Sequence, residues 1–266
     1  MSCPSCGYKG SDIYDRKYVV TTLRRCHLCQ LLYRAPTTTQ AENKIFYQGK
    51  YKQGFTTNLP NDEELTIYLD NGFLGTEKDY STYIRVLECA GAKQGDRLFD
   101  FGCSWGYGSW QFKRYGFEVE SFEISGPRAE FARNKLGIKV SSSLCDVSAS
   151  CDIFFSSHVL EHVPSVQEII DLGFRILKPG GLFVAFTPNG STCYRQKNPD
   201  NWHRAWGLVH PNVLDEFYYK KVFSGRPFFL SSDPYVLQEI VGWKENQKIF
   251  HFGQLDGAEL LVIARK

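Results

Sequence analysis

Four cysteines near the start of the chain have the types and the spacing of a metal site. They form two pairs, Cys3-x-x-Cys6 and Cys26-x-x-Cys29. Pairs of this spacing supply four thiolates, which match a closed tetrahedral zinc site, whereas two unrelated redox or buried pairs are the alternative. His27 lies inside the second pair, and we expect it to face solvent. We therefore predict a structural zinc ion held by Cys3, Cys6, Cys26 and Cys29.

A glycine-rich turn and two carboxylates form a second candidate site. The stretch Asp100-Phe-Gly102-Cys103-Ser-Trp-Gly106 lies between a predicted strand and a predicted helix. Gly102 and Gly106 allow a sharp turn and a close approach of a ligand to the backbone. Asp100 can accept hydrogen bonds from a ligand amine, and Glu123, at the end of the next predicted strand, can bind both hydroxyls of a ribose. An ordinary strand-to-helix turn is the alternative, but the combination predicts a site for a nucleoside-containing ligand.

Alternating strands and helices are expected to position these residues. Ligands of open α/β sheets lie beyond the carboxyl ends of the strands, where both carboxylates fall. Strands separated by helices predict a parallel sheet with helices on both faces. We expect residues 248–252 and 259–264 to close the sheet as an antiparallel pair. The predicted strands are 97–101, 117–124, 138–141, 151–156 and 182–187, and the predicted helices are 83–90, 107–115, 127–136, 166–177 and 235–241.

The periodicity divides the chain into three parts. Residues 1–35 are a small zinc ribbon with expected strands at 14–22 and 31–34. Residues 36–79 are a linker and a partly helical segment rich in aromatic side chains, interpreted as a lid. Residues 80–266 form the ligand-binding α/β domain. The lid aromatics are Phe46, Tyr47, Tyr51, Phe55, Tyr68 and Phe73.

The glycine-rich motif resembles motif I of class I S-adenosylmethionine-dependent methyltransferases. The similarity continues through residues 152–163, 177–181 and 186–189, in the order and at the spacing of that family's later signatures. The resemblance covers residues 80 to 190. It implies an enzyme of class EC 2.1.1. It also implies a Rossmann-like α/β fold with a mostly parallel sheet of seven strands, the last of them antiparallel.

The resemblance also implies how S-adenosylmethionine is bound. Asp100, Gly102 and Gly106 correspond to residues at the methionine end, and Glu123 to the ribose ligand. The acidic residue often found after the third strand has no clear counterpart here, and Ser143 and Asp146 are the alternatives for it. The implied cofactor-binding residues are Asp100, Gly102, Cys103, Gly106, Glu123, Ile124 and Leu144 (both beside the adenine), and Ser156 and His158 beyond the fourth strand.

Histidines are the candidates for acid–base chemistry, because methyl transfer needs a base only to deprotonate a hydroxyl or amine acceptor. The candidate general bases are His158, His162, His203 and His210. Two other interpretations stay open. Glu161 and His162 are structural in the first. In the second, His158, Glu161 and His162, which share a face if helical, join a later histidine around a divalent metal. The metal interpretation resembles small-RNA 2′-O-methyltransferases and some quinone-biosynthesis methyltransferases.

The cysteine-rich leader and the aromatic segment resemble methyltransferases of sugar and polysaccharide biosynthesis. The residues that carry this likeness are 25–33 and the Thr-Pro-Asn signature that ends at Asn189. The expected acceptor is therefore a small polar molecule, a sugar or sugar nucleotide. One alternative is an RNA methyltransferase that uses the zinc ribbon to bind nucleic acid. The other is a non-catalytic protein that binds the cofactor or recruits a partner.

The amino-acid composition limits the kinds of binding partner and the cellular compartment that we expect for this chain. The 266 residues include 42% hydrophobic and 15% aromatic residues, enough for a sizeable core. The net charge of +2, from 31 basic and 29 acidic residues, disfavours a polyanionic partner. No apolar stretch is long enough to span a membrane, and the first residues do not resemble a signal peptide. With nine cysteines and two metal-type pairs, we expect a cytoplasmic protein.

Overall fold

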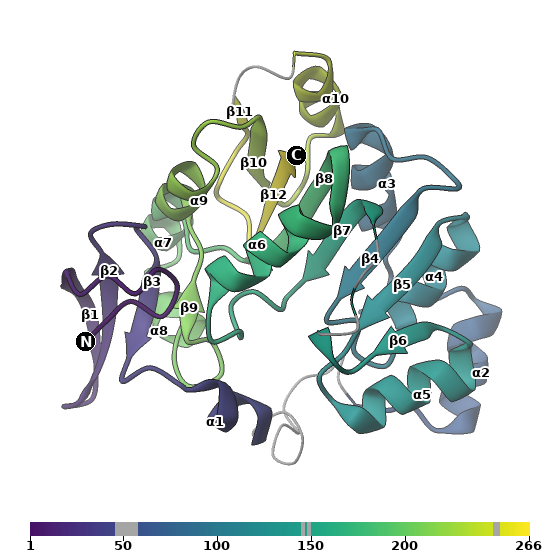
Figure 1. The fold of residues 1–266 in the computed structure, drawn as a ribbon, viewed down its shortest axis with the longest axis horizontal. Coiled ribbons are helices and arrows are strands. Elements are labelled where there is room, and N and C mark those ends of the chain that lie inside the picture. The colour runs from purple at the N-terminus through teal and green to yellow at the C-terminus, as the bar shows by residue number, and fades with distance from the viewer. Residues whose placement is uncertain (46–57, 145–146, 148–149, 247–250) are drawn as a thin grey trace.

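The computed structural model describes residues 1–45, 58–144, 147, 150–246 and 251–266 (Figure 1). Within them, a large sheet covered by helices adjoins a small sheet that contains the N-terminus. The lid aromatics Phe46, Tyr47, Tyr51 and Phe55 and the alternative adenine contact Asp146 lie outside the described residues.

The large sheet has eight strands among the described residues, in the order β11-β10-β12-β8-β7-β4-β5-β6. β12 is antiparallel to β8 and β10, and the other neighbouring pairs are parallel. β11 is a two-residue edge strand, so the body of the sheet has seven strands and the predicted fold class is confirmed. The bounds are β4 Arg97–Phe101, β5 Glu118–Phe122, β6 Lys139–Ser141, β7 Cys151–Ser157, β8 Leu177–Pro188, β10 Phe228–Ser232, β11 His251–Phe252 and β12 Glu259–Arg265.

Helices cover both faces of this sheet because successive strand side chains point to opposite faces. Phe154 belongs to one buried core and its neighbour Phe155 to the other. Full burial of such a side chain contributes about 1.5–3 kcal/mol, so both cores stabilise the central strands. The face of the sheet that carries Phe155 packs against α3 (Ser81–Ala90), α4 (Tyr107–Tyr115) and α10 (Leu237–Asn246). The face that carries Phe154 packs against α6 (Val166–Ile176) and α9 (Glu216–Val222). α5 (Gly126–Leu136) contacts β6.

The closing strands differ from the prediction. Residues 259–264 do form a strand, β12, but it lies between β8 and β10 and does not pair with His251–Phe252, the described part of the other predicted strand. β11 instead pairs in parallel with β10. Because residues 260–264 are all buried, β12 gains more from a central position than from an edge hairpin.

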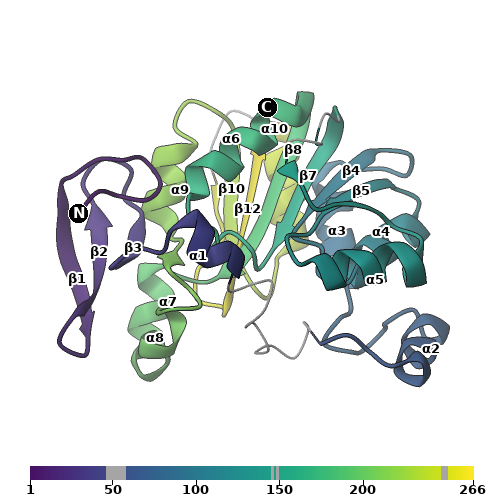
Figure 2. The ribbon, with the colours of Figure 1, turned by 60° about the horizontal axis from the view of Figure 1, so that its bottom comes forward.

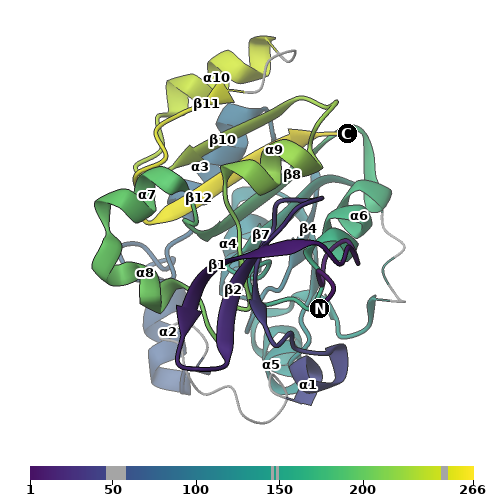
Figure 3. The same cartoon turned by 90° about the vertical axis from the view of Figure 1, so that its left-hand side faces the viewer.

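The N-terminal ribbon forms a four-stranded antiparallel sheet with a strand from the α/β domain. Its strands are β1 (Ser11–Lys17), β2 (Thr21–Cys26), β3 (Leu32–Ala35) and β9 (Asn212–Val213). The single predicted strand at 14–22 is wrong, because a turn at residues 18–20 divides it into a hairpin, with Tyr18 at a φ of 56°. The ribbon lies beside α9, α7 (Thr192–Lys197) and α8 (Pro199–Ala205), as Figures 1 and 2 show. Figure 3 views the molecule from the ribbon side.

Two short helices belong to the segment between ribbon and main sheet. α1 (Gln40–Ile45) follows the ribbon. α2 (Asp62–Asp70) begins with a capping box in which Asn61 and Glu64 each accept a bond from the other's backbone. Leu65 and Phe73 then pack against Trp105 in the glycine-rich turn, so this segment contacts the candidate ligand site. Among the described residues no helix combines the length and apolarity that crossing a membrane requires.

Candidate functional site

The four predicted metal ligands lie together. The Sγ atoms of Cys3 and Cys29 are 3.6 Å apart, those of Cys6 and Cys26 are 3.5 Å apart, and all four lie within 4.8 Å of one another. Zinc–sulfur bonds of ~2.3 Å in a tetrahedron place sulfur atoms roughly 3.8 Å apart, so the cluster has the right size. The bond from Cys29 lowers the pKa of Cys3 to about 5, although burial opposes it. His27 lies outside the cluster, 3.1 Å from Asp12.

The glycine-rich turn lies between β4 and α4 in the predicted position. Gly102 and Gly106 have φ values of 86° and 90°, the left-handed region that favours glycine. A Cβ atom at Gly102 would lie 2.4 Å from Val159, and one at Gly106 would lie 2.8 Å from Ala132 of α5. The missing side chains therefore also allow two close packing contacts, one with the loop after β7 and one between α4 and α5.

The two predicted carboxylates flank this turn at the carboxyl ends of adjacent strands. Asp100 of β4 is buried and accepts a 2.6 Å hydrogen bond from Ser109. Burial raises the pKa of Asp100 to about 7, although the bond from Ser109 opposes it. Glu123 follows β5, is also buried, and accepts bonds from the backbone N–H groups of Ser104 (2.9 Å) and Ser125 (2.8 Å). Both carboxylates are thus held rigidly beside the turn.

The remaining predicted cofactor residues occupy different surroundings. Cys103 is buried, and its backbone N–H donates to the Phe122 carbonyl. Ile124 is partly buried beside Glu123, whereas Leu144 is exposed. Ser156 of β7 is fully buried and its hydroxyl has no hydrogen-bond partner among the described residues. These roles in cofactor binding stay predictions.

Glu161 and His162 lie beside His210, which is far from them in the sequence. Their ligand atoms lie within 4.8 Å of one another, and Glu161 is buried with no hydrogen-bond partner for either carboxylate oxygen in the described part of the chain. Burial raises the pKa of Glu161, but the charges of His162, His158 and His210 outweigh it and lower the pKa to about 2. The segment 158–163 is not helical, so the condition under which its residues would share a helical face is not met.

Each of the two imidazoles is oriented by a backbone carbonyl. Nδ1 of His162 lies 2.7 Å from the Val209 carbonyl, and Nδ1 of His210 lies 3.3 Å from the Ala205 carbonyl. Since a carbonyl only accepts, Nδ1 carries a proton in both rings, and the neutral form of each ring has its lone pair on Nε2. Nε2 of His162 is 3.6 Å from Glu161. Two lone pairs on nitrogen and a buried carboxylate are a suitable donor set for a divalent cation.

His158 belongs to a neighbouring cluster that the sequence did not reveal. Its Nε2 lies 2.7 Å from Glu259, the first residue of β12, and its Nδ1 lies 3.6 Å from Glu161. Glu259 also accepts hydrogen bonds from Tyr83, at 2.7 Å, and from Tyr235. The cluster adjoins the glycine-rich turn because Val159 contacts Gly102. No local motif marks Glu259, since its partners lie in three distant segments.

His203 lies apart from both clusters. Its side chain is 63% exposed and its Nδ1 is 3.9 Å from Asp15 of the ribbon. The other three predicted histidines, His158, His162 and His210, surround Glu161. The structure therefore brings three of the four candidate bases together and leaves His203 at the surface.

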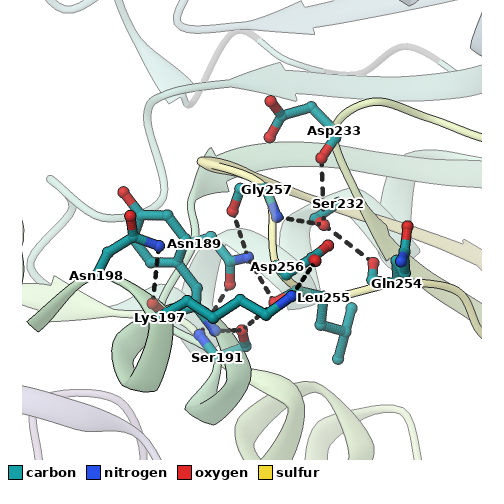
Figure 4. A network of polar contacts seen from close by, with 11 residues as sticks. Asn189, Ser191, Lys197, Asn198, Ser232, Asp233, Gln254, Leu255, Asp256 and Gly257 are labelled. Atoms are coloured by element: carbon teal, nitrogen blue, oxygen red, sulfur yellow. Dashed lines mark hydrogen bonds and ion pairs between the residues drawn. The ribbon is translucent and has the colours of Figure 1, made fainter.

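The Thr-Pro-Asn signature connects the end of β8 to the loop before β12. The Asn189 side chain donates to the carbonyls of Leu255 and Gly257 and accepts from the Ser191 backbone (Figure 4). Further along this loop, the Glu259 backbone N–H donates to Asp233 at 2.5 Å. The network thus fixes the start of β12, from which the Glu259 carboxylate reaches His158.

A family model described as "Methyltransferase domain" matches residues 77–228. The chain is 28% identical over 147 residues to the 24-methylenesterol C-methyltransferase 2 of Oryza sativa subsp. japonica, covering 49% of this chain and 39% of that protein. It is 30% identical over 142 residues to the ubiquinone biosynthesis O-methyltransferase of Chelativorans sp. (strain BNC1), covering 46% and 56%. The chain thus spans 39% to 62% of the first curated relatives it matches.

Solved structures agree in fold. The geranyl diphosphate C-methyltransferase of Streptomyces coelicolor A3(2) is similar with a TM-score of 0.53 and 13% identity, over 86% of this chain and 99% of that one. The plantazolicin methyltransferase BamL is similar with a TM-score of 0.53 and 15% identity, over 84% and 95%. At such identities the likeness supports the fold alone.

Proposed function

Since this chain belongs to the methyltransferase-domain family, as its motifs predicted, we propose that it transfers a methyl group from S-adenosylmethionine to a small polar acceptor containing a sugar. The observation that carries the proposal is the pair of buried carboxylates, Asp100 and Glu123, on either side of a left-handed glycine turn. This pair offers one acceptor group to an amine and one to two adjacent hydroxyls, the arrangement that an amino-acid nucleoside needs.

The residues of the site act mainly by positioning. When bound, S-adenosylmethionine supplies an electrophilic methyl group, so orientation of the acceptor accounts for much of the rate. Asp100 would hold the amino group and Glu123 the ribose, with Ile124 and Leu144 beside the adenine. Ser156 is near the end of β7 and His158 directly follows the strand, where the acceptor would approach. Among the described residues, this side also holds Glu259 and two tyrosine hydroxyls, which suit a polyhydroxylated acceptor.

The histidines differ in their suitability as a base. Partial burial lowers the pKa of His158, but Glu161 and Glu259 outweigh it and raise the pKa to about 10. Burial lowers the pKa of His210. A neutral imidazole is needed to take a proton, so His210 is the better base near neutral pH and His158 the better hydrogen-bond donor.

Binding and transfer assays test the assignment separately. Calorimetry should detect binding of S-adenosylmethionine and of its demethylated product, and failure to bind either would overturn the methyltransferase assignment. Labelled methyl groups should then appear in a sugar nucleotide from a panel that also contains RNA. Label found only in RNA would overturn the sugar assignment and favour the RNA methyltransferase alternative.

We also propose that Cys3, Cys6, Cys26 and Cys29 hold a zinc ion with a structural role. Their burial and spacing support it, and a closed site of four thiolates leaves no position for substrate. Elemental analysis of the purified protein should find about one zinc ion per chain. Cys26→Ser should lose it, and Cys193→Ser, at an exposed cysteine outside the cluster, should retain it.

As the alternative to a histidine base, we propose a divalent metal at Glu161, His162 and His210, with His158 beside it. The carbonyl-oriented imidazoles and the Glu161 carboxylate, which has no hydrogen-bond partner among the described residues, support a divalent cation there. Such a cation would lower the pKa of an acceptor hydroxyl. Titration with Mn²⁺ should show binding that Glu161→Gln abolishes and that Glu130→Gln, an exposed control on α5, preserves. Equal Mn²⁺ affinity in both variants would refute this site.

A further inference from the structure

The N-terminal ribbon shares a sheet with the acceptor side of the α/β domain, a name used here for the segments around Glu161, His162 and His210. β3 pairs with β9, with Leu32 opposite Val213 and Tyr33 opposite Asn212. The pairing extends one residue further, because the Arg34 N–H donates to the Pro211 carbonyl at 2.7 Å. β9 is only two residues long, and a strand so short depends on its neighbour for its position.

Asn212 of β9 connects this sheet to the loop that carries Glu161 and His162. Its backbone N–H donates to the Glu161 carbonyl at 3.1 Å, and its side chain donates to the Val163 carbonyl at 2.7 Å. Asn212 is 2% exposed, so water cannot replace either bond readily. One buried residue therefore holds both ends of the segment 161–163.

The segment just before β9 positions the two histidines. It includes His210 itself and the Val209 carbonyl that accepts from His162 at 2.7 Å. The Gly207 N–H donates to the His210 carbonyl at 3.0 Å, which closes this segment into a compact turn. Because Pro211 and Asn212 are fixed by β3, the ribbon sets where this turn ends.

The two Cys-x-x-Cys turns, residues 3–6 and 26–29, are called the cysteine knuckles here, and they are themselves attached to the α/β domain. The Ser5 hydroxyl, between Cys3 and Cys6, accepts from the Gln167 N–H at the start of α6 (3.2 Å) and contacts the Tyr218 hydroxyl of α9 (3.3 Å). Cys3, Cys26 and Cys29 belong to the same buried core as residues of α6 and α9. The position of the cysteine knuckles is thus transmitted to α6, which follows the loop 158–165, and to α9, which follows β9.

The cofactor side shares the extended buried core of the ribbon through Phe101 and Phe122, but its glycine-rich turn has no hydrogen-bonded connection to the ribbon in the described residues. Gly102 and Cys103 are held by the Phe122 carbonyl, and Ser104 and Ser125 are held by Glu123. No hydrogen bond or ion pair in the described part of the chain joins these residues to the ribbon. Val159 of the acceptor loop packs on Gly102.

We infer that the ribbon is a positioning element for the acceptor side of the site, acting through β3, β9 and Asn212 on Glu161, His162 and His210. The inference rests on the proposed function only for the meaning of the acceptor side. Loss of the metal from the cysteines loosens the knuckles and β3, which releases β9 and the segments around Glu161 and His210. The nucleoside site keeps its structure.

Hydrogen exchange of the full-length protein tests this without a known acceptor. In Cys26→Ser, amides in residues 158–164 and 205–214 should exchange about tenfold faster or more, because each lost hydrogen bond is worth about a factor of ten. Amides in residues 98–106 and 118–125 should stay within about twofold, as should affinity for S-adenosylhomocysteine. Cys193→Ser is the matched control and should exchange like the native protein.

A second pair of variants keeps the test informative if Cys26→Ser fails to fold. Asn212→Ala removes the bond to Val163, and Asn198→Ala removes an equivalent amide-to-carbonyl bond to Tyr194 outside this connection. Only Asn212→Ala should speed exchange in residues 158–164. Faster exchange confined to residues 1–35, or equal effects of the two asparagine variants, would overturn the inference. If the native protein fails to bind S-adenosylhomocysteine, the proposed function fails and the exchange result still decides this inference.

Discussion

Removal of the Glu123 carboxylate tests the location of the cofactor site most directly. Both oxygens of this buried side chain accept backbone N–H groups, Oε2 from Ser104 and Oε1 from Ser125, and each keeps a second lone pair. Those lone pairs are the ones available to two ribose hydroxyls. Glu123→Ala removes both acceptors at once, together with the hydrogen bond that Ser104 of the glycine-rich turn donates to Glu123.

The expected loss follows from two charge-assisted hydrogen bonds. Each contributes about 1.5 kcal/mol or more, so the pair contributes about 3 kcal/mol, or roughly a 150-fold weaker affinity for S-adenosylhomocysteine. Burial raises the pKa of Glu123, which shows that the ionised group is costly to bury. Its removal relieves that cost, which offsets the loss of the two backbone bonds, and we expect the variant to fold. Glu123→Gln places an amide N–H₂ against a backbone N–H, so it should also weaken binding by about tenfold or more.

Calorimetric titration with S-adenosylhomocysteine measures the effect, with circular dichroism to check the fold. Glu120→Gln is the matched control, because Glu120 lies on β5, the strand that Glu123 follows, but pairs at the surface with Lys139 at 2.7 Å. Its affinity should match the native protein within about twofold. Native-like affinity in a folded Glu123→Ala protein would refute the placement of the ribose and, with it, the proposed orientation of the cofactor.

Three further outcomes are expected. Burial raises the pKa of Asp100 to about 7, whereas the ammonium group of a bound ligand favours the ionised carboxylate. Binding of S-adenosylhomocysteine at about pH 6 should therefore release close to one proton. Calorimetry in buffers of different ionisation enthalpy measures this release, and Asp100→Asn should abolish it. Arg25→Met leaves the fully buried Asp215 without its 2.6 Å partner and should lower the free energy of unfolding by about 3 kcal/mol in urea titrations, whereas no change would mean that the pair is not formed. Gly102→Ala combines a φ of 86° with a Cβ atom 2.4 Å from Val159, so it should lower thermal stability and abolish cofactor binding; a native melting temperature would contradict the turn geometry.

Buried contacts connect the N-terminal ribbon to the α/β domain. A buried ion pair joins Arg25 to Asp215, whose other oxygen caps α9 by accepting from the Tyr218 N–H. β9 then completes the ribbon's sheet from the other side of the chain. A structural metal in the ribbon would consequently stabilise the α/β domain as well as the first 35 residues, since binding of a metal to the native state adds to its folding free energy.

The sequence alone was sufficient to predict the features that depend only on residues close together in the chain. The cysteine pairs, the glycine turn and the acidic residues at strand ends each depend on a few adjacent residues, and the structure places them as predicted. Local periodicity also identified the strands β4 to β8 and the helices between them, because the side-chain pattern of a buried strand or an amphipathic helix repeats within a short window. It failed at Tyr18, where one residue with positive φ turns an apparently continuous strand into a hairpin.

Tertiary structure alone decided which distant groups meet. Nothing local links His158 to Glu259, 101 residues away, or Glu161 to His210, because those contacts depend on where β12 and β9 are inserted. Strand order is set by burial and packing over the whole sheet, and so residues 259–264 lie at its centre instead of forming a closing hairpin. The residues of the proposed cofactor half of the site were therefore predictable from motifs. The acceptor half is assembled by long-range pairing.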